Sequence, residues 1–287
     1  MSKVADILRN KTQIPVTICD VSPPRGTEIE FLKEIEHLGV DGISVAYNPG
    51  KSVRIDSAIL SYAIKKHVGK DVVFNLATRD MNKLAIQSHL LGAAMLGLEN
   101  LVVLKGDDFS DKDMLITKDV NDFKPTELIH NIKNMNRGLD YRGRKLNAAT
   151  DFCVGATIDL NRGIEVEVSL THSKVCHGAD FFITQPIFDT REIEQFPAIY
   201  ESFAGVPLNV PVFYGLQILA RDSVVFNSVP VEVLHDLEVG RDGVELALIQ
   251  WNQLIELGVD GIYLVPPIHK GGLRDYHAVE RLLERVS

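Results

Sequence analysis

Several polar side chains stand directly after short apolar runs, where folding could bring them together for chemistry. The clearest case is Lys105-Gly106-Asp107, which follows the apolar residues 101–104. A short apolar run with a polar boundary predicts a strand buried on both faces, as in a parallel sheet. Asp107 at such a strand end could hydrogen-bond an amide-rich heterocycle, or it could cap the loop that follows.

Other polar side chains hold equivalent positions. Gln185 follows the apolar residues 181–183, and its amide can both donate and accept hydrogen bonds at the edge of a ligand ring. Asp20 could serve such a site, or it could start the turn at Ser22-Pro23. The remaining polar side chains of the set are Asn75, Lys105, Thr157, Asp159, Tyr214 and Gln217, and Gly106 adds backbone beside Lys105. The rim that these side chains would form is rich in carboxylates and amides.

A repeated hexapeptide indicates the helices and strands that position this rim. The hexapeptide Leu-Gly-Val-Asp-Gly-Ile occurs at 38–43 and again at 257–262, and each copy is predicted to end a helix and open a strand. The predicted strands are 15–23, 42–48, 71–77, 100–105, 151–157, 180–185, 211–216 and 261–266. The predicted helices are 28–38, 57–68, 80–97, 126–138, 165–177, 190–203, 231–257 with a break near Gly240, and 275–286.

Eight alternating strand and helix units predict an α/β fold, a single (β/α)8 TIM barrel over residues 1–287. An open doubly wound sheet usually has about five or six strands, so it fits less well. In a barrel of this kind the active site lies at the carboxyl ends of the strands. The polar tips listed above would therefore surround one mouth.

Two segments near the mouth carry further predictions. Helix 80–97 has apolar or small residues at one helical spacing, namely Met81, Leu84, Ala85, Ser88, Leu91, Gly92 and Met95, which predicts its buried face. Asp80 is expected to cap that helix, and Gly97 to end it in the left-handed conformation. The loop 108–125 is long and charged, which makes it a candidate lid.

Composition excludes several classes of protein. The net charge of −9 and the pI near 5.5 give no general basic field for nucleic acid. No run reaches the roughly 18 apolar residues of a membrane span, and three scattered cysteines suit a reducing compartment, so we expect a cytoplasmic protein. Neither a Rossmann glycine motif nor a metal-binding histidine spacing is present, and we expect no metal. Whether the chain forms a homo-oligomer is left open.

The motifs, taken together and in order, resemble the methylenetetrahydrofolate reductase family over most of the chain. They are Ser22-Pro23-Pro24-Arg25-Gly26, Ser44-Val45-Ala46-Tyr47, Thr78-Arg79-Asp80-Met81-Asn82, the run 86–93, Leu104-Lys105-Gly106-Asp107, and Ile183-Thr184-Gln185 with Phe188-Asp189. The resemblance implies a flavin-binding barrel that interconverts methylenetetrahydrofolate and methyltetrahydrofolate. Hydride would pass through FAD, and NADH or NADPH would be the co-substrate.

The resemblance also implies roles for particular residues. Asp107 matches the family's aspartate beside flavin and pterin, and Gln185 matches its folate-binding glutamine. Glu167 and Lys174 match positions near the flavin ribose and phosphates, and the backbone of Gly106 would lie against the flavin. The implied set is Asp20 and Asp107 for catalysis, Asn75, Lys105, Gly106, Asp107, Thr157, Asp159, Glu167 and Lys174 for the cofactor, and Ser22, Gln185, Tyr214 and Gln217 for the tetrahydrofolate substrate.

This chain departs from the family pattern at several of these positions. Asp20 aligns with the family's catalytic glutamate and is one methylene shorter. Ala46, Asn75 and Lys105 stand where relatives often have Thr, His and Arg, and a lysine lacks the bidentate fork of an arginine. Two alternatives follow: a flavin-free enzyme that passes hydride directly between nicotinamide and folate, or a folate-binding barrel that delivers its ligand to a partner protein.

Overall fold

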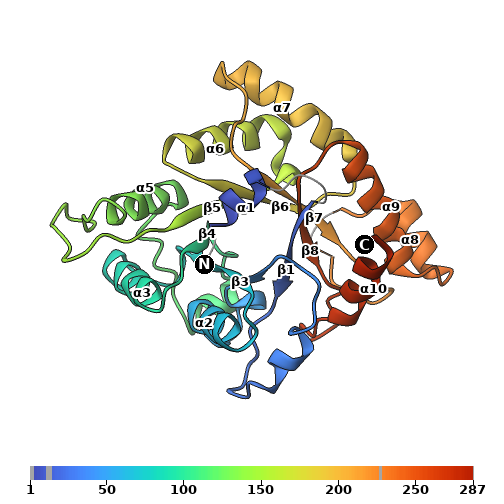
Figure 1. Ribbon diagram of the computed structural model, residues 1–287, viewed down its shortest axis with the longest axis horizontal. Helices are drawn as coiled ribbons and strands as arrows, with labels where there is room; N and C mark the ends of the chain where they lie inside the picture. Colours follow the sequence, from blue (N-terminus) through green and yellow to red (C-terminus); the bar gives the residue numbers. More distant parts are fainter. Residues whose placement is uncertain (1–2, 11–14, 226–227, 287) are drawn as a thin grey trace.

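Eight parallel strands form a closed barrel in the computed structural model, which describes residues 3–10, 15–225 and 228–286 (Figure 1). Each strand pairs with the next along the chain, and the last pairs with the first. The strands are β1 Val16–Val21, β2 Gly42–Val45, β3 Asp71–Ala77, β4 Asn100–Leu104, β5 Cys153–Ile158, β6 Phe181–Pro186, β7 Val212–Gln217 and β8 Gly261–Val265. The predicted fold class is confirmed.

Helices surround the barrel because each parallel crossover needs an element that covers the outer face of the sheet. They are α2 Ser57–His67, α3 Lys83–Met95, α5 Pro125–Met135, α6 Ile164–Cys176, α7 Thr190–Ala204, α8 Val231–Glu238, α9 Gly243–Glu256 and α10 Tyr276–Val286. The expected break near Gly240 separates α8 from α9, and Gly240 has φ 94°. Across the described residues, no helix is long and apolar enough to cross a membrane.

The first predicted helix, 28–38, is wrong. Only a short 3₁₀ turn, η1 Glu30–Glu34, forms there. The buried residues Leu32, Ile35 and Leu38 recur every three positions, which matches the three residues per turn of a 3₁₀ helix better than the 3.6 of an α-helix.

The predicted buried face of α3 is also wrong. Leu84, Leu91 and Met95 are 60%, 40% and 83% exposed, whereas Ile86 and Leu90 are fully buried. The helix is apolar on several sides, so the helical spacing of apolar residues did not distinguish the buried face from the solvent-exposed one. Its N-cap is Asn82, which accepts a hydrogen bond from the Ala85 amide at 2.9 Å, and not Asp80. Gly97 has φ 73°, as expected for a helix terminus.

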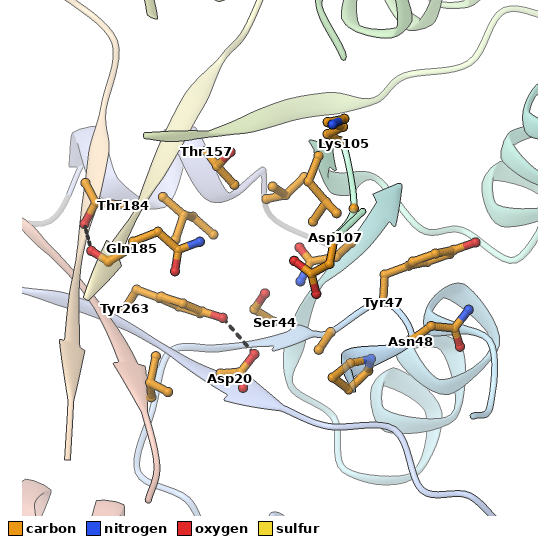
Figure 2. Close-up of a pocket in the computed structure, with 18 of the residues that line it drawn as sticks. Asp20, Ser44, Tyr47, Asn48, Lys105, Asp107, Thr157, Thr184, Gln185 and Tyr263 are labelled. Carbon is orange, nitrogen blue, oxygen red and sulfur yellow. Dashed lines mark hydrogen bonds between the residues drawn. The ribbon is translucent and has the colours of Figure 1, made fainter. Parts of the chain in front are cut away.

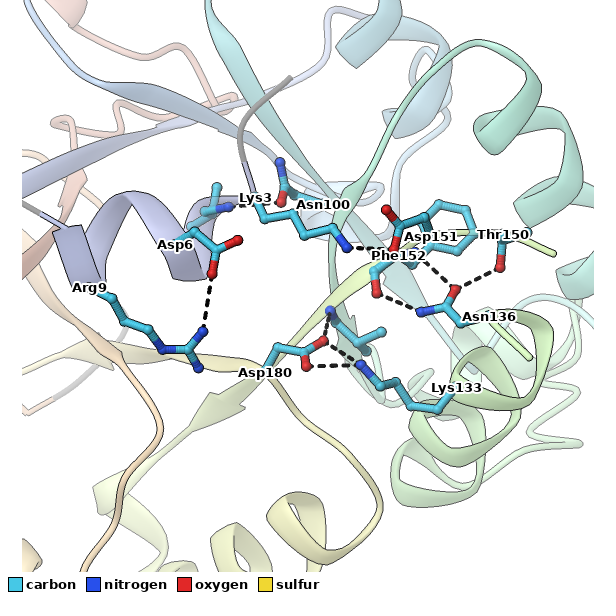
Figure 3. Close-up of polar contacts among 12 residues, drawn as sticks. Lys3, Asp6, Arg9, Asn100, Lys133, Asn136, Thr150, Asp151, Phe152 and Asp180 are labelled. Atoms are coloured by element: carbon cyan, nitrogen blue, oxygen red, sulfur yellow. Dashed lines mark hydrogen bonds and ion pairs between the residues drawn. The ribbon is translucent and has the colours of Figure 1, made fainter. Parts of the chain in front are cut away.

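An unpredicted helix, α1 Val4–Asn10, closes the amino-terminal end of the barrel (Figures 1 and 3). Its side chains Val4, Ala5 and Leu8 pack against inward-facing strand residues that include Val16 and Phe213. Polar contacts hold the helix there: Asn100 Oδ1 accepts from the Val4 amide at 2.9 Å, and Lys3 pairs with Asp151. With this end closed, the opposite end is left for a site.

Candidate functional site

A cavity of about 530 Å³, the strand-tip cavity, lies at the carboxyl ends of the strands. Seven of the predicted site residues line it, and they come from β1, the β3 and β4 ends, β5 and β6. These residues are Asp20, Asn75, Lys105, Gly106, Asp107, Thr157 and Gln185. Figure 2 shows Gln185 and Asp107 approaching the cavity from different strands, with Ser44 and Asp20 also at its wall. The closed barrel therefore brings together polar side chains that are up to 165 positions apart by their numbers.

Six predicted site residues do not line this cavity. Tyr214 packs in the outer apolar layer between barrel and helices, because its neighbour Phe213 points inward and strand side chains alternate. Ser22 is buried, and its amide donates to the Tyr276 hydroxyl at 3.3 Å. Asp159 caps the turn Leu160–Arg162. Gln217 faces a separate, smaller cavity.

The remaining two, Glu167 and Lys174, form a buried ion pair on α6. Lys174 Nζ lies 2.9 Å from Glu167 Oε1 and also donates to the Thr157 carbonyl at 2.6 Å. Burial lowers the pKa of Lys174, and the Glu167 carboxylate opposes that shift. The Lys174 ammonium group is thus bound by protein atoms and does not line the cavity.

Asp20 is held by two residues that the sequence did not single out. Arg274 donates to Asp20 Oδ2 at 2.5 Å, and the Tyr263 hydroxyl donates to Asp20 Oδ1 at 2.7 Å (Figure 2). Asp20 and Arg274 are each at least nine-tenths buried, although both line the cavity. Both carboxylate oxygens accept hydrogen bonds from the protein, which fixes the orientation of the Asp20 side chain at the cavity wall.

Tyr263 could have been found from strand alternation. Burial and the neighbouring Asp20 carboxylate raise the pKa of Tyr263 well above its ordinary value, so the phenol keeps its proton and donates. Its inward position follows from its place at the centre of β8, two residues after the inward Gly261. Arg274 lies in an irregular loop before α10, where no periodicity marks it.

Two buried polar atoms at the cavity wall have no hydrogen-bond partner among the described residues. They are Ser44 Oγ and Arg274 Nε. Ser44 lies directly opposite Asp20 in the β1–β2 register, so it adjoins the Asp20–Arg274 pair. Buried donors are rarely left unpaired, and these atoms are therefore available to a ligand or to water.

The cations at the rim are paired with carboxylates. Arg79 contacts Asp80 at 2.6 Å, Lys105 contacts Asp108 at 2.6 Å, and Arg162 contacts Asp159 at 3.2 Å. The Lys105 and Arg162 side chains are more than half exposed. Ion pairs of this exposed kind contribute little to stability and exchange readily for a ligand anion.

The predicted lid, 108–125, contains a short helix, α4 Asp111–Met114, with a capping box at Ser110. Backbone hydrogen bonds from Val120 and Asn121 to the Arg79 carbonyl and several side-chain contacts attach it to the rim. Lys51 Nζ lies 2.8 Å from Asp113 Oδ2, and the Arg79 guanidinium lies 4.3 Å from the centre of the Phe109 ring. The loop thus borders the cavity through a half-buried ion pair and through Phe109, which packs against the buried Arg79 side chain.

Comparison with known proteins decides the family. The family model described as methylenetetrahydrofolate reductase matches residues 3–265. The chain belongs to this family. The expected resemblance is therefore confirmed at the level of the family, over nearly the whole chain.

Two individual proteins show how far the similarity extends. Methylenetetrahydrofolate reductase 1 of Schizosaccharomyces pombe is 25% identical over 238 residues, which cover 76% of this chain and 36% of that protein. The chain thus spans about a third of the length of this curated relative. A solved structure, described as an uncharacterized protein from Clostridium thermocellum that binds two copies of 5-methyl-5,6,7,8-tetrahydrofolic acid, aligns with a TM-score of 0.71 at 15% identity, covering 99% of each chain. That likeness shows the fold.

Proposed function

We propose that this protein interconverts 5,10-methylenetetrahydrofolate and 5-methyltetrahydrofolate by hydride transfer, with FAD as the bound carrier and NADH or NADPH as co-substrate. Family membership supports a folate-related reductase, and the solved neighbour's description as a binder of 5-methyltetrahydrofolic acid supports a reduced folate as ligand.

The observation that carries the proposal is the meeting of Gln185 and Asp107 at one cavity. A pterin presents a flat edge of amide, amine and ring N–H groups. Gln185 can donate to and accept from such an edge, and the Asp107 carboxylate can accept two of its N–H groups. The volume of about 530 Å³ lies within the range of ligand pockets, and it suits a ring system with part of its tail.

The residues at the cavity also fit a flavin ring. Asn75 and Thr157 offer neutral hydrogen-bonding groups, and Gly106 presents backbone without a side chain on a positive φ of 87°. When bound there, FAD would supply the hydride-transfer chemistry. Lys105 and Arg162, both at the exposed rim, are the cations free to exchange their carboxylates for its phosphates. Lys174, expected from the resemblance to do so, is instead held by Glu167 and Thr157.

Asp20 remains the residue we propose for proton exchange with the folate. Closing the folate's one-carbon bridge during oxidation of methyltetrahydrofolate releases a proton from the substrate. The Asp20 carboxylate lies at the cavity wall, and uptake of that proton requires one of its oxygens to release the hydrogen bond from Arg274 or Tyr263. Reduction would require Asp20 to hold a proton and to loosen its contact with Arg274.

A flavin-free enzyme is the second candidate, and the Glu167–Lys174 pair favours it. Glu167 is fully buried, so an FAD whose phosphates needed Lys174, as the resemblance implied, would have to break a buried pair. Breaking such a pair leaves an uncompensated charge, which is strongly destabilising. In this candidate, hydride passes directly between the nicotinamide and the folate at the same cavity.

Turnover of the purified protein separates the candidates. The protein is stripped of flavin, and oxidation of methyltetrahydrofolate is followed with and without added FAD, with a nicotinamide or an artificial dye as acceptor. Turnover that requires FAD supports the proposal, and turnover with a nicotinamide alone supports the second candidate. Tight folate binding without turnover under every condition would exclude both and leave a folate-delivering barrel.

A further inference from the structure

A second cavity, of about 250 Å³, lies between the end of β7 and the helices α8 and α9. Phe188, Leu219, Leu246 and Ala247 form much of its apolar wall. Its lining residues, as far as the structure describes them, include none of those at the strand-tip cavity. Phe188 and Gln217 place one side of it beside the carboxyl ends of β6 and β7, the end of such barrels where ligands bind.

Gln217 gives this cavity one unused hydrogen-bond acceptor. The side chain is 2% exposed, and its Nε2 donates to the Val224 carbonyl at 2.8 Å. That contact fixes the orientation of the side-chain amide. Gln217 Oε1 is buried and has no partner among the described residues. A buried acceptor without a donor is costly, so a molecule in the cavity gains by bringing an N–H or O–H group.

The charges at this cavity are already balanced. Arg241 lies 2.9 Å from Asp236 and 3.9 Å from Glu245, so its guanidinium faces two carboxylates. A ligand anion would have to displace them, and a ligand cation would meet the guanidinium. The lining therefore favours a neutral molecule.

We propose that this second cavity binds a small neutral aromatic heterocycle whose ring N–H donates to Gln217 Oε1. The apolar wall with Phe188 suits a flat ring, and the volume admits one single or fused ring but not a dinucleotide or a whole folate. The segment from Gln185 to Phe188 contributes to both cavities, so the heterocycle lies beside the first cavity without sharing it. This proposal does not depend on the proposed function.

Indole and 1-methylindole form the matched pair of probes, because they share a ring system and differ in the donor. Binding of each to the full chain is measured by ligand-observed NMR and by calorimetry. We expect indole to bind about tenfold more tightly than 1-methylindole, since only indole satisfies the buried acceptor. Equal affinities, or no binding of either probe at its solubility limit, would overturn the proposal.

Three variants assign the preference to this cavity. Gln217→Met keeps the length of the side chain and removes the acceptor, so the ratio of the two affinities should fall to about one. Gln195→Leu removes an exposed glutamine from α7 and should leave the ratio unchanged. Should Gln217→Met fail to fold, Leu246→Phe serves instead, because it fills the cavity and should abolish binding of both probes. A preference for indole that survives in Gln217→Met, or indole binding that survives in Leu246→Phe, contradicts the assignment.

Discussion

Asp20 owes its environment to residues from the far end of the chain, since Arg274 is 254 positions away and Tyr263 is 243 positions away. Sequence reasoning found Asp20 from its place after an apolar run, but it could not find Arg274. The loop that carries Arg274 has no periodicity, and the barrel must close before β1 meets β8. The role of Asp20 therefore depends on tertiary contacts that no local pattern encodes.

Loss of Arg274 should destabilise the protein through Asp20. Arg274→Met leaves a buried carboxylate supported only by Tyr263, and we expect a loss of about 3–5 kcal/mol in the free energy of unfolding. The double variant Asp20→Asn, Arg274→Met leaves no uncompensated charge and should regain most of that loss. Urea denaturation measures both, and a single variant as stable as the parent would show that the pair is not formed.

The exposed cations at the cavity rim should contribute to cofactor binding. Arg162→Ala should weaken FAD binding by about tenfold, because a charge-assisted contact to phosphate is lost. Arg191→Ala is the matched control, since Arg191 forms a similar exposed pair with Asp189 away from the cavity lining. Flavin fluorescence titration measures both affinities. Equal affinities for the two variants would remove Arg162 from the cofactor site.

The elements were predicted with uneven success, and the reasons are physical. Strands buried on both faces are short apolar runs with polar ends, so all eight were identified. The face of α3 was not, because a helix with apolar residues on several sides does not reveal which side packs. Helix α1 was missed because its seven residues are too few to establish a periodicity.

Helix α1 should contribute to stability without affecting ligand binding. Leu8 is 5% exposed inside the amino-terminal end of the barrel, so Leu8→Ala should cost about 2–5 kcal/mol. Leu84→Ala, on the exposed face of α3, should change stability by less than about 0.5 kcal/mol. Thermal unfolding compares the two. Reduced affinity of the folded Leu8→Ala protein for methyltetrahydrofolate would show that the two ends of the barrel are coupled.

Loop 108–125 should loosen when its contacts with the rim are removed. Phe109→Ala removes the ring beneath the Arg79 guanidinium, and Lys51→Ala removes the partner of Asp113. Limited proteolysis should cleave both variants within the loop several times faster than the parent protein. Leu115→Ala, at a side chain that is 84% exposed, should be cleaved at the parent's rate. Unchanged cleavage in all three would mean that these contacts do not hold the loop.

At the scale of the whole molecule, the barrel separates stability from chemistry. The amino-terminal end is closed by α1, and the polar side chains gather at the opposite end around one cavity. This division follows from parallel strands, whose carboxyl ends all point the same way. It explains why residue type and position after a strand were enough to predict seven members of the cavity lining. The six others lie outside that lining because strand alternation, loop geometry and the buried Glu167–Lys174 pair direct them elsewhere.

We propose the strand-tip cavity as the folate site, and equilibrium binding of methyltetrahydrofolate tests this assignment most directly. Calorimetric titration compares the parent chain with Gln185→Leu, which removes the amide at the cavity, and with Tyr214→Phe, which changes only the outer layer. We predict that Gln185→Leu binds about tenfold or more weakly and that Tyr214→Phe binds like the parent. Binding that is unaffected by Gln185→Leu, or absent in the parent, would contradict the account.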